Sequence, residues 1–103
     1  MFIGFFPLEG TVAFLYQALN ASLVPTAADS LPGYRVYGPD GTLMNNGTGT
    51  TASFDSANVT GVYRGTKAAS SADGYEAGET YHIRVAATVG GSAKAQIFTF
   101  IVT

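Results

Sequence analysis

The sequence predicts an all-β fold, an antiparallel two-sheet sandwich of about seven strands. Ala, Gly, Thr and Ser make up nearly half of the 103 residues, and this composition favours strands and turns over long helices. Turn signals recur about every 8–12 residues, and no stretch of any length shows the helical period. The longest regular segment instead alternates apolar and polar residues with a period of two. Together these observations are typical of a sandwich.

Composition also limits the size and the partners of the chain. With 103 residues, of which 47% are hydrophobic and 12% charged, the chain is long and apolar enough to fold as one domain. Five basic residues against seven acidic ones leave no basic stripe, so we expect neither nucleic-acid nor membrane binding. The absence of Cys excludes a disulfide framework, a thiolate nucleophile and a cysteine-ligated zinc.

The clearest strand spans residues 79–89. Its apolar face carries Tyr81 and Ile83, whereas its polar face carries His82 and Arg84. Because successive side chains of a strand point to opposite faces, this alternation predicts a strand with one buried face and one face in water.

A hairpin is expected directly after this strand. Gly90-Gly91-Ser92 supplies residues that accept the positive φ angles of a tight turn, and residues 93–103 form the returning strand. The returning strand is apolar on both sides, since Phe100 and its neighbours alternate with Ile97 and Ile101. We therefore expect it to lie centrally in its sheet or to have its outer face covered.

The upstream half is predicted as short strands separated by turns. Residues 11–20 alternate as a strand, with a helix as the rival interpretation. Gly38-Pro39-Asp40-Gly41 is a strong turn signal, because Pro fixes φ and Gly accepts the left-handed conformation. The other predicted segments are strands at 34–37, 42–44 and 59–68, connections at 23–30, 55–58 and 70–74, and a polar stretch at 45–53 interpreted as a strand with a loop or a mobile tip.

Residues 1–9 are interpreted as an apolar N-terminal arm or first edge segment, and residues 10–103 as the sandwich domain. No basic residue precedes the apolar run, and Pro7 and Glu9 interrupt it, so we expect it to belong to the mature protein. Its large side chains either add to the core or form a patch that another subunit covers, because soluble monomers seldom leave such a patch in water. These side chains are Phe2, Ile3, Phe5, Phe6 and Leu8.

Candidate catalytic and metal-binding groups are few. The one histidine, His82, lies on the polar face of its strand, and no Gly-x-Ser-x-Gly nucleophile motif accompanies it. The carboxylates fall in predicted turns, where they cap backbone N–H groups, and they lack calcium-loop spacing. Tyrosines without tryptophan are more typical of core or cross-strand packing than of a sugar-binding platform. We therefore expect no catalytic, cofactor-binding or metal-binding residues and no enzymatic activity.

Five segments of the chain share a pattern with a known group of proteins. They are Gly10-Thr11-Val12, Tyr34 to Gly41, Thr60-Gly61-Val62-Tyr63, Gly74 to Tyr81 and Phe98 to Val102. With this order the chain resembles small immunoglobulin-like proteins encoded among the virion genes of tailed bacteriophages and prophages. The resemblance covers most of the chain after Glu9, and bacterial surface modules of immunoglobulin-like or fibronectin-like type carry similar strands. The apolar start has no counterpart in it.

The resemblance implies an immunoglobulin-like sandwich and a role as a virion structural protein, above all a capsid decoration or cement subunit, with neck or tail attachment as a variant. The implied partners are the major capsid protein or other virion proteins, together with copies of the chain itself. The implied location is the virion, assembled in the host cytoplasm. Within this interpretation we expect partner contacts from Met1 to Leu8 and from the strand face that carries Ile97, Thr99 and Ile101.

Two functions of other classes stay open. A carbohydrate- or surface-binding module of a phage tail or neck, or of a bacterial surface protein, predicts exposed tyrosines clustered in a groove. A small hydrolase requires His82 beside a carboxylate and a hydroxyl in a cleft. The positions of the tyrosines and of the histidine therefore discriminate among the three functions.

Overall fold

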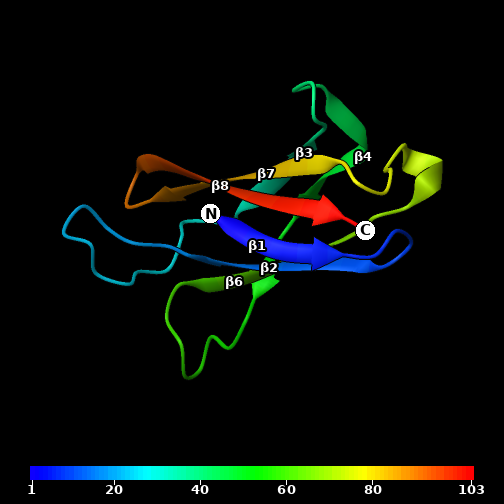
Figure 1. Ribbon diagram of the computed structural model, residues 1–103. Coiled ribbons are helices and arrows are strands. Elements are labelled where there is room, and N and C mark those ends of the chain that lie inside the picture. Colours follow the sequence, from blue (N-terminus) through cyan, green and yellow to red (C-terminus); the bar gives the residue numbers. More distant parts are fainter.

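The computed structural model describes all residues 1–103 and places eight strands in two packed sheets (Figure 1). The larger sheet has the strand order β1-β8-β7-β3-β4, and the smaller sheet has the order β2-β6-β5. The only helical segment is a 3-10 turn, η1 (Ser71–Asp73), and no helix is long and apolar enough to cross a membrane. The strands are β1 (Phe2–Phe6), β2 (Thr11–Gln17), β3 (Gly33–Tyr37), β4 (Leu43–Thr50), β5 (Ala52–Ser53), β6 (Val62–Ala68), β7 (Thr80–Val89) and β8 (Ser92–Val102).

This strand order is that of an immunoglobulin-like sandwich, the fold that the resemblance implies. β2, β6 and β5 take the places of strands B, E and D, whereas β8, β7 and β3 take those of G, F and C. One pair departs from the antiparallel pattern, because β1 runs parallel to β8. These two strands lie at opposite ends of the chain. No hairpin joins them, and the rest of the domain serves as the long crossover that a parallel pair needs.

A turn of two glycines joins β7 to β8. Gly90 and Gly91 have φ angles of 56° and 81°, and a two-residue type I′ hairpin requires positive φ at both positions. The Asp29 carboxylate accepts hydrogen bonds from both glycine amides, at 3.1 and 2.9 Å, and so fastens the β2–β3 loop to this hairpin. The predicted hairpin is confirmed, and β8 lies in the interior of its sheet between β1 and β7.

A tyrosine anchors the start of β7. The Tyr81 hydroxyl accepts a hydrogen bond of 2.8 Å from the backbone N–H of Glu76. The same kind of contact, the tyrosine corner, occurs at the start of strand F in immunoglobulin-like domains. Gly78 lies between the two residues with a φ of 89°, which allows the chain to turn there. The motif from Gly74 to Tyr81 therefore has a structural role in the sandwich.

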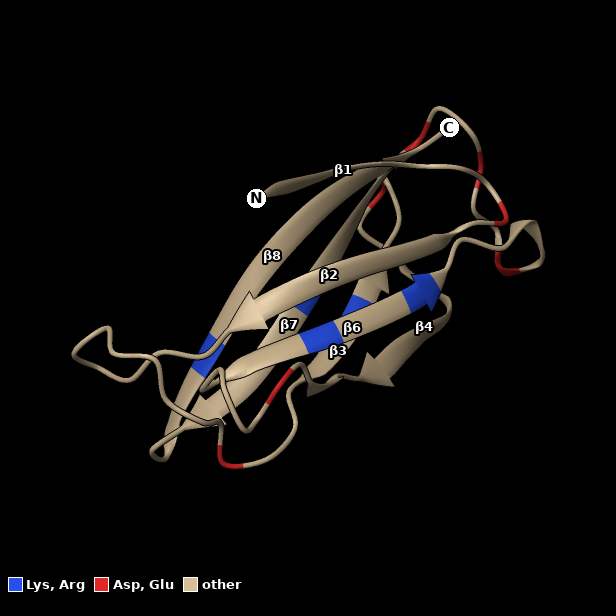
Figure 2. Ribbon diagram, turned by 90° about the horizontal axis from the view of Figure 1, so that it is seen from below, with Lys and Arg blue, Asp and Glu red and all other residues tan.

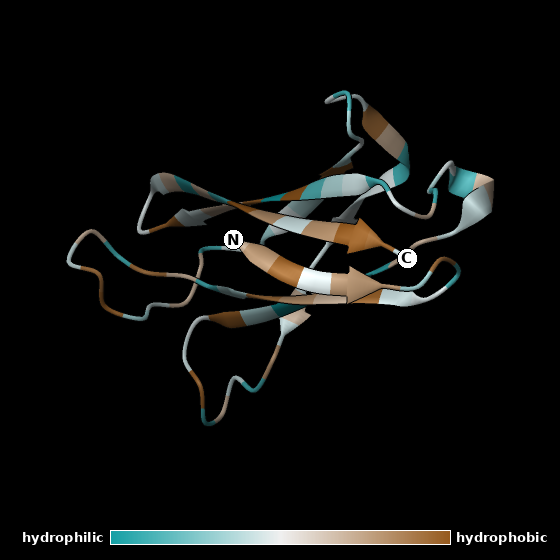
Figure 3. Cartoon of the chain, viewed as in Figure 1, coloured by the Kyte–Doolittle hydropathy of each residue, from teal (hydrophilic) through white to brown (hydrophobic).

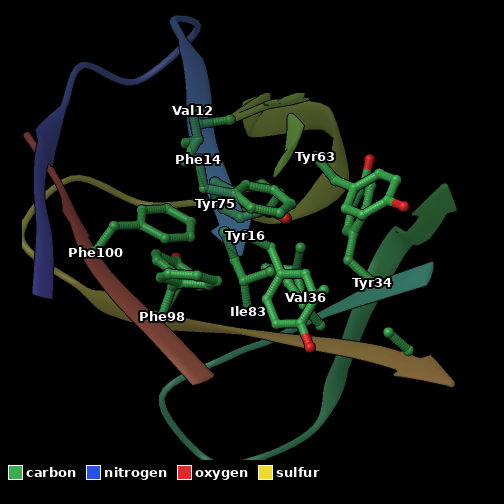
Figure 4. Close-up of a cluster of buried hydrophobic side chains, with 14 of the residues drawn as sticks. Val12, Phe14, Tyr16, Tyr34, Val36, Tyr63, Tyr75, Ile83, Phe98 and Phe100 are labelled. Atoms are coloured by element: carbon green, nitrogen blue, oxygen red, sulfur yellow. The ribbon is translucent and has the colours of Figure 1, made fainter. Parts of the chain in front are cut away.

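The core between the sheets is rich in aromatic side chains (Figure 4). Phe14 of β2 packs against Tyr34 and Phe98 of the larger sheet, with ring centroids 5.3 and 5.7 Å apart. Tyr81 and Phe100 stack at 5.6 Å. Five of the six tyrosines are buried, which confirms the prediction that they pack in the core. The buried ones are Tyr16, Tyr34, Tyr63, Tyr75 and Tyr81.

The substitution Tyr75→Phe is expected to raise the free energy of unfolding by about 1 kcal/mol. The Tyr75 hydroxyl is buried without a hydrogen bond to any protein group, so its desolvation is uncompensated. Burial also raises the pKa of Tyr75. The native protein therefore loses stability as the pH rises above about 10, the pKa of an unfolded tyrosine, and the variant loses less. Urea denaturation at about pH 7 and about pH 11 measures both effects.

Tyr34→Phe is the matched control for this experiment. The Tyr34 hydroxyl donates a hydrogen bond of 2.9 Å to the Thr66 carbonyl, so its removal is expected to cost about 1 kcal/mol. The two substitutions remove the same atom from the same core and should change stability in opposite directions. A loss of stability in Tyr75→Phe equal to that in Tyr34→Phe would contradict the assignment of an unpaired hydroxyl.

The polar stretch at 45–53 contributes to two strands, β4 and β5, rather than forming a mobile tip. β4 bulges between its pairings with Arg35 and Tyr37, and Asn46 takes a φ of 54° within the bulge. The Asn46 side-chain amide donates a hydrogen bond of 2.9 Å to the Asp73 carboxylate, which ties the bulge to η1.

Two predicted strands are shorter than expected. β2 ends at Gln17 and β6 begins at Val62, whereas the sequence patterns extend over 11–20 and 59–68. The Gln17 side-chain amide contacts the backbone carbonyls of Ala18 and Gly61 at 2.9 and 3.2 Å. A polar side chain thus satisfies backbone groups at the point where the two strands separate.

Candidate functional site

The apolar start of the chain forms β1, and a bulge divides its side chains between two faces. Gly4 has a φ of 130°, and the register of β1 against β8 shifts beside it. Ile3 and Phe6 pack against the core, with the Phe6 ring 5.9 Å from that of Phe100. Leu8 packs against the core as well. Three of the residues expected to contact a partner therefore stabilise the chain's own sandwich.

Phe2 and Phe5 lie on the outer face of the five-stranded sheet. Their side chains are 52% and 64% exposed, and their ring centroids are 5.4 Å apart in an edge-to-face contact. Phe2 pairs with Thr99 of β8 and Phe5 with Ile101, which is half-buried. Ile97 is 53% exposed on the same face. We call Phe2, Phe5, Ile97 and Ile101 the apolar stripe. The strands that carry it, β1 and β8, are hydrophobic over much of their length (Figure 3).

The single histidine lies next to this stripe on β7. The Nδ1 atom of His82 is 3.0 Å from the hydroxyl oxygen of Thr99, and the imidazole makes no hydrogen bond or ion pair with a carboxylate. Tyr37 of β3 pairs with His82 and is half-buried, so the one tyrosine outside the core has no tyrosine beside it on the surface. Neither the hydrolase arrangement nor a tyrosine platform is assembled here.

Basic and acidic residues occupy different parts of the structure (Figure 2). All five Lys and Arg residues lie on strands, whereas all seven Asp and Glu residues lie outside them. The one ion pair of the chain joins Lys67 to Asp73 at 3.2 Å. As a result, Arg35 of β3 and Arg84 of β7 share the outer face of the larger sheet without an acidic partner.

Several carboxylates cap backbone turns, as the sequence predicts. Glu9 accepts a hydrogen bond of 2.8 Å from the Ser71 amide, and hydrogen bonding by Ser71 lowers the pKa of the Glu9 carboxyl. Asp40 accepts a hydrogen bond of 3.0 Å from the Thr42 amide, which lowers the pKa of Asp40 in the same way. No group of three or more His, Asp or Glu side chains is arranged to hold a metal ion.

The sequence alone does not reveal the arginine pair. Strand alternation placed Arg84 on the polar face of its strand, but nothing in the sequence showed that Arg35 would lie opposite it. That proximity follows from the sheet order, in which β3 is the neighbour of β7. The available signal was weak: each arginine occupies a polar position of a predicted strand.

Comparisons with known proteins add no family assignment. No protein-family model matches the chain, and no curated protein or solved structure matches it. A functional proposal therefore rests on the surface described above and on the resemblance of the five sequence segments.

Proposed function

We propose that this chain is a non-enzymatic structural protein of a tailed-bacteriophage virion, a decoration or cement subunit that binds the assembled coat-protein lattice. The observation that carries the proposal is the apolar stripe, with two exposed phenylalanines side by side on the outer face of a sheet. The resemblance to virion proteins suggests the particle, and the stripe suggests how the chain attaches to it.

The stripe has the properties of a protein contact. Phe2 and Phe5 already contact each other, so little side-chain freedom is left to lose when a partner covers them. Complete burial of a phenylalanine stabilises a complex by about 1.5–3 kcal/mol. Soluble monomers seldom leave neighbouring aromatic side chains in water without such a use.

A repetitive lattice suits a small contact surface. Each copy buries only a modest area, but many copies on one shell add their contributions to the stability of the particle. A subunit that binds the expanded lattice better than its precursor stabilises the expanded form, because a ligand shifts an equilibrium through its difference in affinity for the two states.

The double substitution Phe2→Ser and Phe5→Ser is expected to lower the affinity for expanded shells at least tenfold, since two aromatic contacts are lost. Co-sedimentation of the purified protein with expanded shells of the phage that encodes it, free of their own decoration protein, measures the occupancy. Circular dichroism confirms that the variant is folded.

The matched control is Leu23→Ser with Val24→Ser. Both side chains are exposed, at 76% and 52%, but they lie in the β2–β3 loop and are not part of the stripe. The control is expected to bind shells as the unaltered protein does. If the Phe2→Ser, Phe5→Ser variant occupies shells as fully as the unaltered protein, the stripe is not the contact. If the unaltered chain does not bind shells, the proposed function is refuted.

A further inference from the structure

Two arginines lie directly opposite each other on the outer face of the larger sheet. Arg35 of β3 pairs with Arg84 of β7, and residues paired in this way have Cβ atoms about 5 Å apart. Both side chains are exposed, and neither forms an ion pair. Like charges directly opposite each other are destabilising, so this pair does not help the isolated fold.

The surface is hollowed around the two arginines. The hollow has a volume of about 440 Å³ and borders on small residues of β3, β4 and β7, namely Gly33, Gly49 and Ala86. A side chain at position 49 is excluded by the core, because a Cβ there would overlap the ring of Tyr34. The exposed residues Thr48 and Thr50 add hydroxyl groups at the β4 side.

These groups suit an oxyanion such as a carboxylate. Two guanidinium groups offer planar pairs of N–H donors, which match the two oxygens of a carboxylate, and threonine hydroxyls can donate further hydrogen bonds. A bound carboxylate would also remove the repulsion between the two arginines.

We propose that this hollow binds carboxylate side chains of an acidic segment of the partner protein; under the proposed function, that partner is the coat lattice. The arginine hollow is continuous with the apolar stripe, because Arg84 pairs with Ile97 across β7 and β8. The surface thus selects a segment in which acidic residues lie next to apolar ones, and the charges fix its orientation.

A nucleic acid is disfavoured as the occupant by the charges of the chain. The formal net charge is -2, and seven carboxylates occupy the loops at the ends of the strands. An extended phosphate backbone binds through several basic contacts and would pass close to these carboxylates. A short acidic segment needs only the central hollow.

The test compares the double variant Arg35→Gln, Arg84→Gln with the variant Arg64→Gln. Arg64 is the matched control because it is also exposed but lies on β6 of the other sheet. Two-dimensional NMR follows the titration of the purified protein with acetylated hexaglutamate and with hexaglutamine at low salt. Hexaglutamate is expected to shift the amide signals of Thr48, Thr50 and Ala86 in the unaltered protein and in the control. The double variant is expected to show no such shifts, and hexaglutamine to cause none in any protein.

Two further probes identify the source of the anion. Inorganic phosphate or a thymidine oligonucleotide that binds the hollow more tightly than hexaglutamate would overturn the assignment to an acidic protein segment. So would hexaglutamate shifts that persist in the double variant, or their absence from the unaltered protein.

Shell binding separates this inference from the proposed function. The double variant is expected to bind shells at least tenfold more weakly, and the affinity of the unaltered protein to fall more steeply with salt than that of the variant. Normal shell binding by the double variant would refute the arginine hollow but leave the proposed function standing. Hexaglutamate binding without any shell binding would refute the proposed function and leave the hollow standing.

Discussion

A chain shortened to residues 9–103 is expected to lose about 2–5 kcal/mol of its free energy of unfolding, since it lacks three half-buried apolar side chains that pack against the core. The truncation also removes backbone hydrogen bonds that hold β1 in place. The Thr99 amide donates to the Met1 carbonyl at 2.7 Å, and the Thr103 amide donates to the Phe6 carbonyl at 2.9 Å. The loss leaves β8 as an uncovered edge strand, which favours aggregation.

Urea denaturation of the full and shortened chains measures this effect. The Phe2→Ser, Phe5→Ser variant is the control, because both of its altered side chains are exposed; it is expected to stay within about 1 kcal/mol of the unaltered protein. An unchanged denaturation midpoint after truncation would show that residues 1–8 are a dispensable arm. If the shortened chain is destabilised as expected, its failure to bind shells says nothing about contact, and only the point substitutions test the stripe.

The sequence alone could not predict that the apolar start has two roles. Its run of large side chains indicates burial but not whether the chain itself or a partner buries them. The division depends on the bulge at Gly4, which sends Ile3 and Phe6 inward and leaves Phe2 and Phe5 outside. A bulge of one residue is a property of the β1–β8 pairing, and the two paired strands lie at opposite ends of the sequence.

Local patterns predicted the rest of the larger sheet well. Alternation correctly assigned the buried face of β7, which includes Tyr81 and Ile83, and Gly90-Gly91 correctly located the hairpin. Both features depend on neighbours in the sequence. The apolar character of both faces of β8 also predicted its central place, because the sheet edge belongs to β1. The arginine hollow could not be predicted in this way, since it needs the register of β3 against β7.

Gly65→Ala is expected to lower stability by about 3 kcal/mol and the melting temperature by roughly 10–20 °C. Gly65 of β6 pairs with Phe14 of β2, and the phenyl ring of Phe14 lies over the glycine, so a Cβ there would overlap the ring. Tyr34 and Phe98 restrain the ring, because their ring centroids lie 5.3 and 5.7 Å from that of Phe14. Thermal unfolding followed by circular dichroism measures the change.

Gly33→Ala is the matched control, because Gly33 also lies within a strand but a Cβ there would be 3.6 Å from its nearest neighbour, the Gly49 carbonyl oxygen. That distance is an ordinary contact, and we expect a change within about 0.5 kcal/mol. A second test combines Gly65→Ala with Phe14→Leu. If the clash is the cause, the smaller side chain gives the new methyl group room, and the double variant loses less than the sum of the two single losses. Additive losses, or equal losses in Gly65→Ala and Gly33→Ala, would mean that backbone freedom rather than the Phe14 ring requires glycine at position 65.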